Sequence, residues 1–184
     1  WVKQDMAAIT LLNEIETFHT EISKELNGAG SKQLKQIIRE IRQLLQSAPP
    51  ALYDAAYDLV VSNGELMSTA VVSDYLNLSG LTNQELDARK VLITNEAYRN
   101  ARVSWEETSG KIRAAFDESN PEQFAPVTIT QGFIGSTPAN LTTTLGREGS
   151  DYTAAILGNV LNAESVSFWK DVPGVLSADP KKME

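Results

Sequence analysis

Residues 127–151 read VTITQGFIGSTPANLTTTLGREGSD, and this stretch decides the fold. The β-branched run Val127–Thr130 predicts a strand, and Thr142–Leu145 predicts a second short strand. Each strand is followed by a glycine-rich corner. At Gly132 and Gly135, in the first corner, the missing Cβ lets the backbone approach a ligand closely. The stretch therefore predicts two strands that end in corners suited to binding.

The second corner leads directly into a predicted helix. Residues Tyr152–Leu161 have the alanine-rich, apolar pattern of a packed helix. Ser150 and Asp151 are residue types that commonly cap a helix N-terminus, so we expect the cap there. A helix start beside glycines offers free backbone N–H groups and a positive dipole end. This corner is thus a candidate site for a phosphate or carboxylate group.

Several motifs in and around this stretch resemble those of aspartate kinases, in the amino-acid kinase superfamily. They occur in order and with consistent spacing, which one isolated glycine pattern would not. The matching segments are Ser62–Thr69, Gln131–Ser136, Thr142–Arg147, Gly149–Ala155, Trp169–Val175 and Ala178–Pro180. The resemblance is strong from about Ala51 to the end of the chain and weak before it.

The resemblance implies ATP-dependent phosphorylation of the side-chain carboxylate of L-aspartate, giving 4-phospho-L-aspartate, with ATP and Mg²⁺ required. This is the first step of lysine, threonine and methionine biosynthesis. A carboxylate is already an anion at neutral pH, so positioning and charge stabilisation can suffice without a general base. That fits a chain with no cysteine, one histidine and no Ser/His/Asp arrangement.

An amino-acid substrate with two carboxylates and an ammonium group calls for a guanidinium fork and carboxylates. By the resemblance, Arg147 clamps a substrate carboxylate, with Asp151 and Glu65 near the ammonium group. The resemblance assigns the pocket wall to Phe133, Gly135 and Ser150. From the residues alone, Arg147 could be a surface arginine and Asp151 a helix cap. Glu65 could be a charge favourable to the first turn of a helix.

An alternating strand is predicted at Ser165–Trp169, and ligands of open α/β sheets bind beyond the carboxyl ends of such strands. The resemblance assigns the nucleotide to the segment that follows this strand. The inherited positions are Lys170, Asp171, Gly174, Leu176 and Lys181. Many relatives have threonine, tyrosine and arginine at positions 170, 176 and 181, so the assignments at 171 and 174 are firmer. Glu148 stands where the family usually has glycine. Because a carboxylate would repel phosphate, we expect Glu148 to point to solvent.

Two amphipathic helices are expected before the resemblance begins. Apolar residues at spacings of three and four predict the first over Asp5–Asn27. Ser31 should cap a second helix that Pro49 and Pro50 stop. A coiled-coil dimerisation arm is the alternative, but the ordinary lengths and terminal breakers favour packing within the domain.

Helices and strands alternate in the remainder. We expect a helix over Ala51–Ser62, a break at Gly64, and another helix beginning near Glu65. Leu86–Thr94 should form a strand, in which Asp87, Arg89 and Lys90 are interpreted as a solvated or structural set. Ser104–Glu118 should form a helix with Trp105, Ile112 and Phe116 on its inner side. This order predicts an α/β fold, a three-layer α/β/α arrangement with a largely parallel sheet. The resemblance implies that this fold is of the amino-acid kinase or carbamate-kinase type.

Composition excludes several classes. The net charge of −8, with no run of Lys or Arg, argues against nucleic acid as a partner. No apolar run approaches the roughly 20 residues that span a bilayer, so no membrane is expected and the location is predicted to be cytoplasmic. A single histidine without cysteine predicts no zinc site, and no protein metal site is expected.

The ends of the chain depart from the family pattern. The strand with Lys-Phe-Gly-Gly-Thr-Ser and a later Gly-x-Thr-Asn loop are missing. We therefore expect residues 1–184 to be part of a catalytic domain, incomplete at both ends and without ACT domains. Residues 1–50 would be a helical segment, and 51–184 would carry the substrate and nucleotide motifs. The isolated chain is predicted to be inactive, and the full-length protein to be a homo-oligomer. The alternatives are a kinase for glutamate or N-acetylglutamate, or a non-catalytic binding module.

Overall fold

The computed structural model describes residues 7–28, 30–117 and 126–170. The helices are α1 Ala7–Asn27, α2 Lys32–Gln46, α3 Tyr53–Leu78, α4 Trp105–Ala115 and α5 Gly149–Val160. The strands are β1 Gln84–Leu86, β2 Thr128–Thr130, β3 Ile134–Ser136 and β4 Thr142–Thr144, and a short 3-10 helix, η1, covers Ala88–Lys90.

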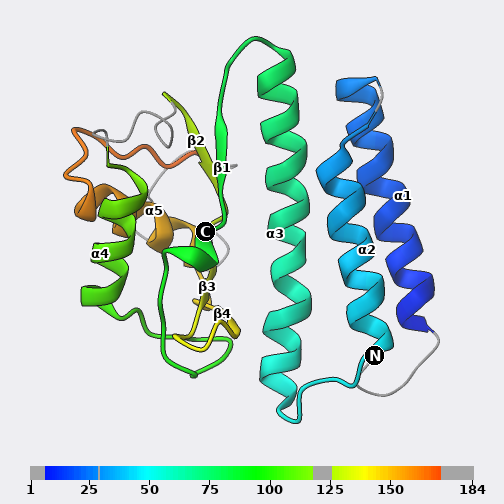
Figure 1. The fold of residues 1–184 in the computed structure, drawn as a ribbon, viewed down its shortest axis with the longest axis horizontal. Helices are drawn as coiled ribbons and strands as arrows, with labels where there is room; N and C mark the ends of the chain where they lie inside the picture. The colour runs from blue at the N-terminus through cyan, green and yellow to red at the C-terminus, as the bar shows by residue number, and fades with distance from the viewer. Residues whose placement is uncertain (1–6, 29, 118–125, 171–184) are drawn as a thin grey trace, which may run out of the picture.

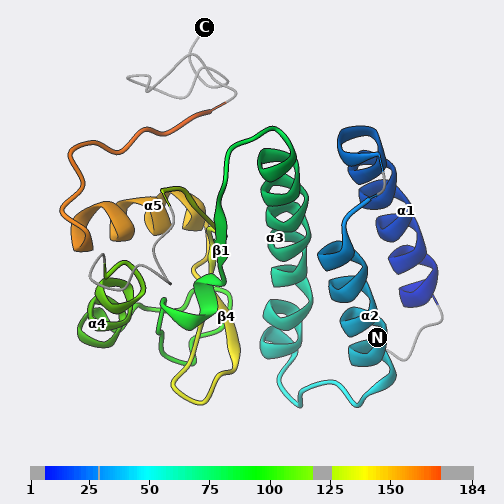
Figure 2. The ribbon, with the colours of Figure 1, turned by 45° about the horizontal axis from the view of Figure 1, so that its top comes forward.

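Helices lie on both sides of the strands. In Figures 1 and 2, α1 and α2 pack on one side of α3, the strands lie on the other side of α3, and α4 and α5 lie beyond them. Helix α3 contacts β1, β2 and β4, while α4 contacts α5. The predicted α/β class is confirmed, and α3 is the helix that joins the two sides.

The described strands pair in both directions. Strands β1 and β2 are parallel, with Glu85 opposite Ile129. Strands β3 and β4 form an antiparallel hairpin, with Gly135 opposite Thr143. A parallel bridge between Ile93 and Ser136 links the hairpin to the segment after η1. The parallel pairings predicted for the sheet are thus accompanied here by one antiparallel pair.

The N-terminal helices pack within the domain, as predicted. Ser31 caps α2, because its side chain accepts a hydrogen bond from the backbone N–H of Leu34. The buried face of α2 and Leu12 of α1 form one core with Met67, Ala70 and Val71 of α3. Apolar residues at helical spacing form one buried face, because removing apolar surface from water stabilises the fold by roughly 25 cal/mol per Å² of that surface.

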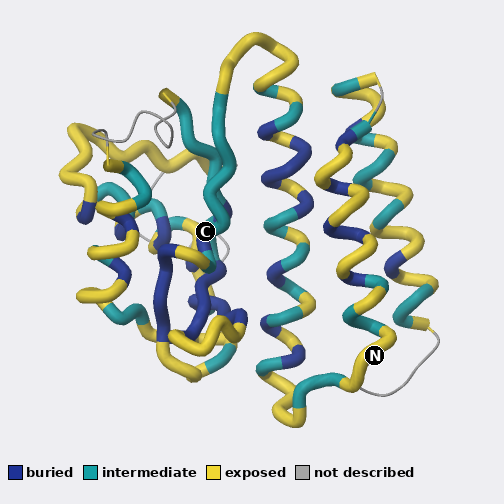
Figure 3. Tube along the Cα trace, in the orientation of Figure 1, coloured by how far each residue is buried: buried dark blue, intermediate teal, exposed yellow. Residues whose placement is uncertain are grey.

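The prediction of two helices separated at Gly64 is wrong. Helix α3 is a continuous helix of 26 residues that runs through Gly64, so Glu65 lies in its middle and not in a first turn. Glycine weakens a helix by only about 1 kcal/mol relative to alanine. Packing outweighs that cost, because α3 has buried residues along its length (Figure 3). Leu66 packs against the cores on both sides of this helix.

The predicted strand Leu86–Thr94 is also largely wrong. Strand β1 ends at Leu86, and Asp87 then caps η1 by accepting a hydrogen bond from the backbone N–H of Arg89. This local bond favours a turn over an extended chain. Beyond η1, Ile93 and Thr94 form only isolated bridges.

Three further expectations fail. Residues Ser165–Trp169 form no strand and pair with no described strand, and Trp169 is 94% exposed. Trp105 is 48% exposed and so does not face inward, whereas Ile112 is buried as predicted. Helix α5 begins at Gly149 with Glu148 in the cap position, which places Ser150 and Asp151 inside the first turn.

Among the described helices, none is both long and apolar enough to cross a membrane.

Candidate functional site

The two glycine corners meet. A Cβ built on Gly132 would lie 2.7 Å from the Cα of Ser150, and one built on Gly149 would lie 2.8 Å from Cδ2 of Phe133. The backbone N–H of Phe133 also donates to Oγ1 of Thr153 in α5, at 3.1 Å. The corner after β2 therefore packs directly on the first turns of α5.

Glycine at these positions lets protein segments approach one another. The space beside Gly132 is filled by Ser150, and a Cβ on Gly135 would lie 2.7 Å from the carbonyl oxygen of Leu92. At both glycines the missing Cβ admits a neighbouring segment of this chain, and their closeness to a ligand stays a prediction. Gly135 is buried in β3.

The corner after β4 carries a group of charged side chains. Arg147 is exposed and makes no hydrogen bond or ion pair with another described residue. Glu148 adopts a left-handed backbone conformation with φ of 56°, and its side chain is 77% exposed. The expectation that Glu148 points to solvent is confirmed. Ser150 and Asp151 follow in the first turn of α5.

Lys170 reaches back to this corner. Its Nζ lies 2.7 Å from Oδ2 of Asp151 and 3.4 Å from Oε2 of Glu148. The hydrogen bond to Asp151 raises the pKa of Lys170, and Glu148 adds to this effect. The structure thus joins a residue assigned to the nucleotide, Lys170, with a residue assigned to the substrate, Asp151. The ammonium group of Lys170 is held between the carboxylate of Glu148, at the cap position of α5, and that of Asp151, in its first turn.

Glu65 lies on a different element from Arg147 and Asp151. It is half-buried on α3, and that burial raises the pKa of its carboxyl group. Within the described residues, its side chain has no hydrogen-bond or ion-pair partner, and no such contact joins it to Arg147 or Asp151. A desolvated carboxylate without a cation is a group that gains from binding one.

Asp58, which the sequence analysis did not single out, is the buried acid of this region. Its side chain is fully buried and accepts three hydrogen bonds. Oδ2 accepts from the backbone N–H of Arg99 at 2.9 Å and of Thr144 at 2.8 Å, while Oδ1 accepts from Oγ1 of Thr144 at 2.8 Å. The one available signal was an acidic residue within the apolar segment Ala55–Val61.

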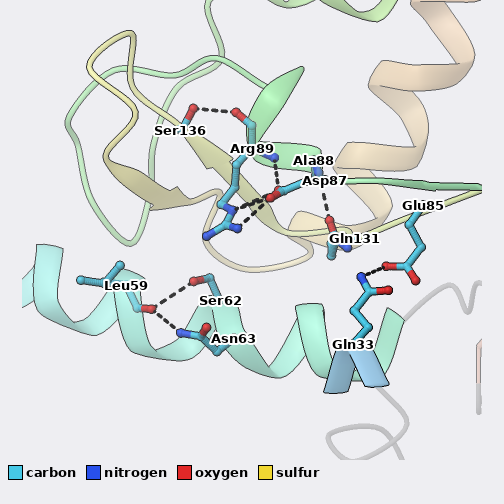
Figure 4. A network of polar contacts seen from close by, with 10 residues as sticks. All are labelled: Gln33, Leu59, Ser62, Asn63, Glu85, Asp87, Ala88, Arg89, Gln131 and Ser136. Carbon is cyan, nitrogen blue, oxygen red and sulfur yellow. Dashed lines mark hydrogen bonds and ion pairs between the residues drawn. The ribbon is translucent and has the colours of Figure 1, made fainter. Parts of the chain in front are cut away.

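A second acidic residue has a structural role, as predicted. Asp87 forms an ion pair with Arg89, with Nη2 and Oδ2 2.7 Å apart (Figure 4). Burial acts to raise the pKa of Asp87, but the hydrogen bonds and charge of Arg89 outweigh it, so the pKa is lowered. Nearby, Oε1 of Gln131 accepts the backbone N–H of Ala88 at 2.9 Å, which ties the corner after β2 to η1.

Four predicted nucleotide positions, Asp171, Gly174, Leu176 and Lys181, lie outside the described residues. Within the ranges that the structure covers, no group of three or more His, Cys, Asp or Glu residues could hold a metal ion.

Known proteins are similar to this chain in both sequence and fold. The lysine-sensitive aspartokinase 3 of Escherichia coli K12 is 38% identical over 150 residues, covering 82% of this chain and 33% of the relative. The chloroplastic bifunctional aspartokinase/homoserine dehydrogenase 1 of Zea mays is 34% identical over 189 residues, covering 98% of this chain and 20% of the relative. The chain therefore spans about a third of the bacterial relative and a fifth of the plant one.

Solved structures agree. E. coli aspartokinase III in complex with aspartate and ADP superposes with a TM-score of 0.71 at 37% identity, over 82% of this chain and 33% of that chain. Clostridium acetobutylicum aspartate kinase, at 24% identity and a TM-score of 0.70, shares the fold over 94% of this chain and 35% of that one. The family profile described as "Amino acid kinase family" matches residues 10–184. The chain belongs to the amino acid kinase family.

Proposed function

We propose that the protein containing this chain is an aspartate kinase, which transfers the γ-phosphoryl group of ATP to the side-chain carboxylate of L-aspartate. The product is 4-phospho-L-aspartate, the entry to lysine, threonine and methionine biosynthesis. The observation that carries the proposal is the corner with Arg147, Ser150 and Asp151 at the start of α5, which packs through Gly149 on Phe133. The similarity to aspartokinases supports the choice of substrate.

Each of these residues has a chemical role in the proposal. Arg147 is exposed and has no partner among the described residues, so its guanidinium is available to clamp a substrate carboxylate through two parallel hydrogen bonds. Asp151 already holds a primary ammonium, that of Lys170, and we propose that it receives the substrate ammonium with Glu65. Phe133, Gly135 and Ser150 form the wall of the pocket. The substrate carboxylate attacks as an anion, so these groups bind and orient it without removing a proton.

The nucleotide is proposed to bind beside this corner. Lys170 lies next to the start of α5, and Asp171, Gly174, Leu176 and Lys181 complete the proposed set. The positive end of α5 favours a phosphate nearby. Mg²⁺ is commonly held by substrate phosphates together with one or two carboxylates. We therefore propose that it arrives with ATP.

Assembly and location are parts of the same proposal. We propose that the intact protein is a homo-oligomer located in the cytoplasm. Size-exclusion chromatography with light scattering would test the first, and fractionation of the source cells the second. A monomer would contradict the proposed assembly, and recovery with organelles would contradict the proposed location. Neither result would bear on the proposed reaction.

The test uses the intact protein and measures ADP release with aspartate, glutamate or N-acetylglutamate as acceptor. We expect activity with aspartate, and a kcat/KM lowered by about 100-fold in Arg147→Ala, because a bidentate carboxylate contact is lost. Arg147→Lys keeps the charge without the planar fork and should recover only part of the loss. Arg113, in the last turn of α4, gives a matched Arg113→Ala control that should retain full activity. Preference for glutamate or N-acetylglutamate would overturn the proposal.

A further inference from the structure

We infer that Asp58 is a positioning residue for the amino-acid site: it fixes the corner that carries Arg147 against the helix that carries Glu65. The inference rests on the proposed function for the roles of those two residues. Among the described residues, the hydrogen bonds of Asp58 go to Arg99 and Thr144 and not to the proposed pocket, so it would act through the backbone of the corner.

The first step is the burial of the Asp58 carboxylate. A fully buried carboxylate is costly unless hydrogen bonds replace its hydration. Here three donors do so, and two of them are backbone N–H groups from segments far apart in the chain, those of Arg99 and Thr144. Bonds to a charged acceptor are about twice as strong as neutral ones. Asp58 thus fixes two backbone segments to α3 at one point.

The second step is that these two segments meet immediately before Arg147. A Cβ on Gly146 would lie 3.0 Å from the carbonyl oxygen of Arg99 and 3.1 Å from Oδ1 of Asn100. Leu145, between Thr144 and Gly146, donates its N–H to the carbonyl oxygen of Phe133 at 2.8 Å. Little backbone freedom therefore remains between Asp58 and the corner.

The third step is the geometry of α3. Asp58 and Glu65 are seven residues apart, close to two turns, so they lie on nearly the same face of the helix and about 10 Å apart along its axis. Because the helix is continuous between them, the distance from Glu65 to the attachment point at Asp58 is fixed. The buried carboxylate of Asp58 therefore sets the position of the corner relative to Glu65.

An amide at position 58 would keep the shape and lose this function. The oxygen of Asn can take the place of Oδ2 and accept from both backbone N–H groups, while its NH₂ group donates to the Thr144 hydroxyl. Because a neutral acceptor binds these donors about half as strongly as a carboxylate, Asp58→Asn should weaken the contacts to Arg99 and Thr144 and shift the corner. Thr144→Val is a milder second variant, since it removes only the hydroxyl that donates to Oδ1 and leaves both backbone donors.

The experiment measures steady-state kinetics in the intact protein. We expect Asp58→Asn to raise KM for aspartate by about tenfold, while KM for ATP changes less than about twofold, since misplacing a binding group weakens what it binds. In an Arg147→Ala background, Asp58→Asn should raise KM for aspartate by less than about a further threefold, because the corner no longer carries the guanidinium that Asp58 positions.

Thr108→Val is the matched control. Thr108 is equally buried, and its hydroxyl bonds the backbone of Ile93 at 3.0 and 3.1 Å, away from the corner. We expect it to lower the melting temperature without changing KM for aspartate. The inference would be overturned if Thr108→Val and Asp58→Asn raised KM for aspartate equally. It would also be overturned if Asp58→Asn raised this KM by the same factor in the wild type and in the Arg147→Ala background.

Amide hydrogen exchange separates this inference from the proposed function. The N–H groups of Arg99 and Thr144 should lose protection in Asp58→Asn but not in Thr108→Val. An intact wild type that forms no ADP with aspartate would refute the proposed function, while unchanged protection of these two amides would refute the role of Asp58.

Discussion

The first turns of α3 and its middle carry the same functional group in opposite states. In the first turns, Asp58 is fully buried and accepts hydrogen bonds from two other segments. In the middle of the helix, Glu65 is half-buried, and its side chain has no partner among the described residues. One carboxylate joins parts of the fold, and the other is desolvated without compensation.

This difference shows how to tell a structural acid from one available to a ligand. Burial with donors from separate segments indicates that the fold needs the charge. Burial without them costs free energy, which a folded protein recovers only when a cation or donor binds. By this criterion Glu65 is the better candidate for an amino-acid ammonium, and Asp58 for the framework.

The largest expected effect breaks the structural half of the comparison. Asp58→Ala removes the acceptor of three buried donors, and each donor left unpaired costs about 1–3 kcal/mol. We expect a loss of about 3–5 kcal/mol in the free energy of unfolding. Urea denaturation followed by circular dichroism measures it. Asp54→Ala, at an exposed position one turn earlier on α3, is the control and should cost less than about 1 kcal/mol.

A smaller loss is expected when only one of the three bonds is removed. Thr144→Val keeps the volume and deletes the hydroxyl that bonds Oδ1 of Asp58 at 2.8 Å. The expected cost is about 1.5–3 kcal/mol, the usual range for one bond to a charged acceptor. Thr144→Ser retains the hydroxyl, so it should be less destabilising than the valine variant. If valine and serine are equally destabilised in thermal melts, the hydroxyl bond contributes nothing.

Glu65→Gln tests the other half, and here the effects on binding and on stability have opposite signs. Losing the charge should raise KM for aspartate by about tenfold, since one charge-assisted contact to the ammonium is lost. Stability should change in the other direction. Because burial raises the pKa of Glu65 from its ordinary value of 4.5, the folded protein holds this proton to higher pH than the unfolded chain.

The charge of Glu65 therefore lowers stability as the pH rises from 4.5 through the folded pKa. At pH 7 we expect Glu65→Gln to melt at a higher temperature than the wild type, and below the unfolded pKa the two should converge. Melting curves at pH 4 and pH 7 measure this. A glutamine variant less stable at pH 7 would mean that Glu65 belongs to the framework as Asp58 does.

The smallest effect concerns the glycine that lies between the two acids. Gly64 is exposed inside a continuous helix, and a Cβ there would meet nothing within 4 Å. Gly64→Ala should stabilise the protein by about 0.5–1 kcal/mol, because alanine loses less conformational freedom in a helix. Differential scanning calorimetry measures the shift. Destabilisation by alanine would show that the helix is not regular at this point.

Sequence patterns predicted the elements whose signals are local. The apolar spacing of α2, its Ser31 cap and the β-branched runs of β2 and β4 all correspond to observed elements. The motifs also indicated the family. Local signals failed where partners distant in the chain decide the outcome: packing carries α3 through Gly64, and Ser165–Trp169 has no described strand to pair with.

The candidate site divides in the same way. Sequence motifs alone identified Arg147, Ser150 and Asp151, because these residues follow one another in a single corner. They could not indicate that Lys170 reaches Asp151, since that ion pair depends on how residues 161–169 return to α5. Nor could they distinguish Asp58 from Asp54, because both are acids in one helix and differ only in what faces them.

By itself, then, the sequence determined the family, the amphipathic helices and the residue types available for binding, since each is written in neighbouring positions. Only the tertiary structure decided which acid is buried, which is half-exposed and which holds an ammonium group. The physical reason is that the free energy of a carboxylate depends on the water it loses and the donors it gains, and both come from segments distant in the chain.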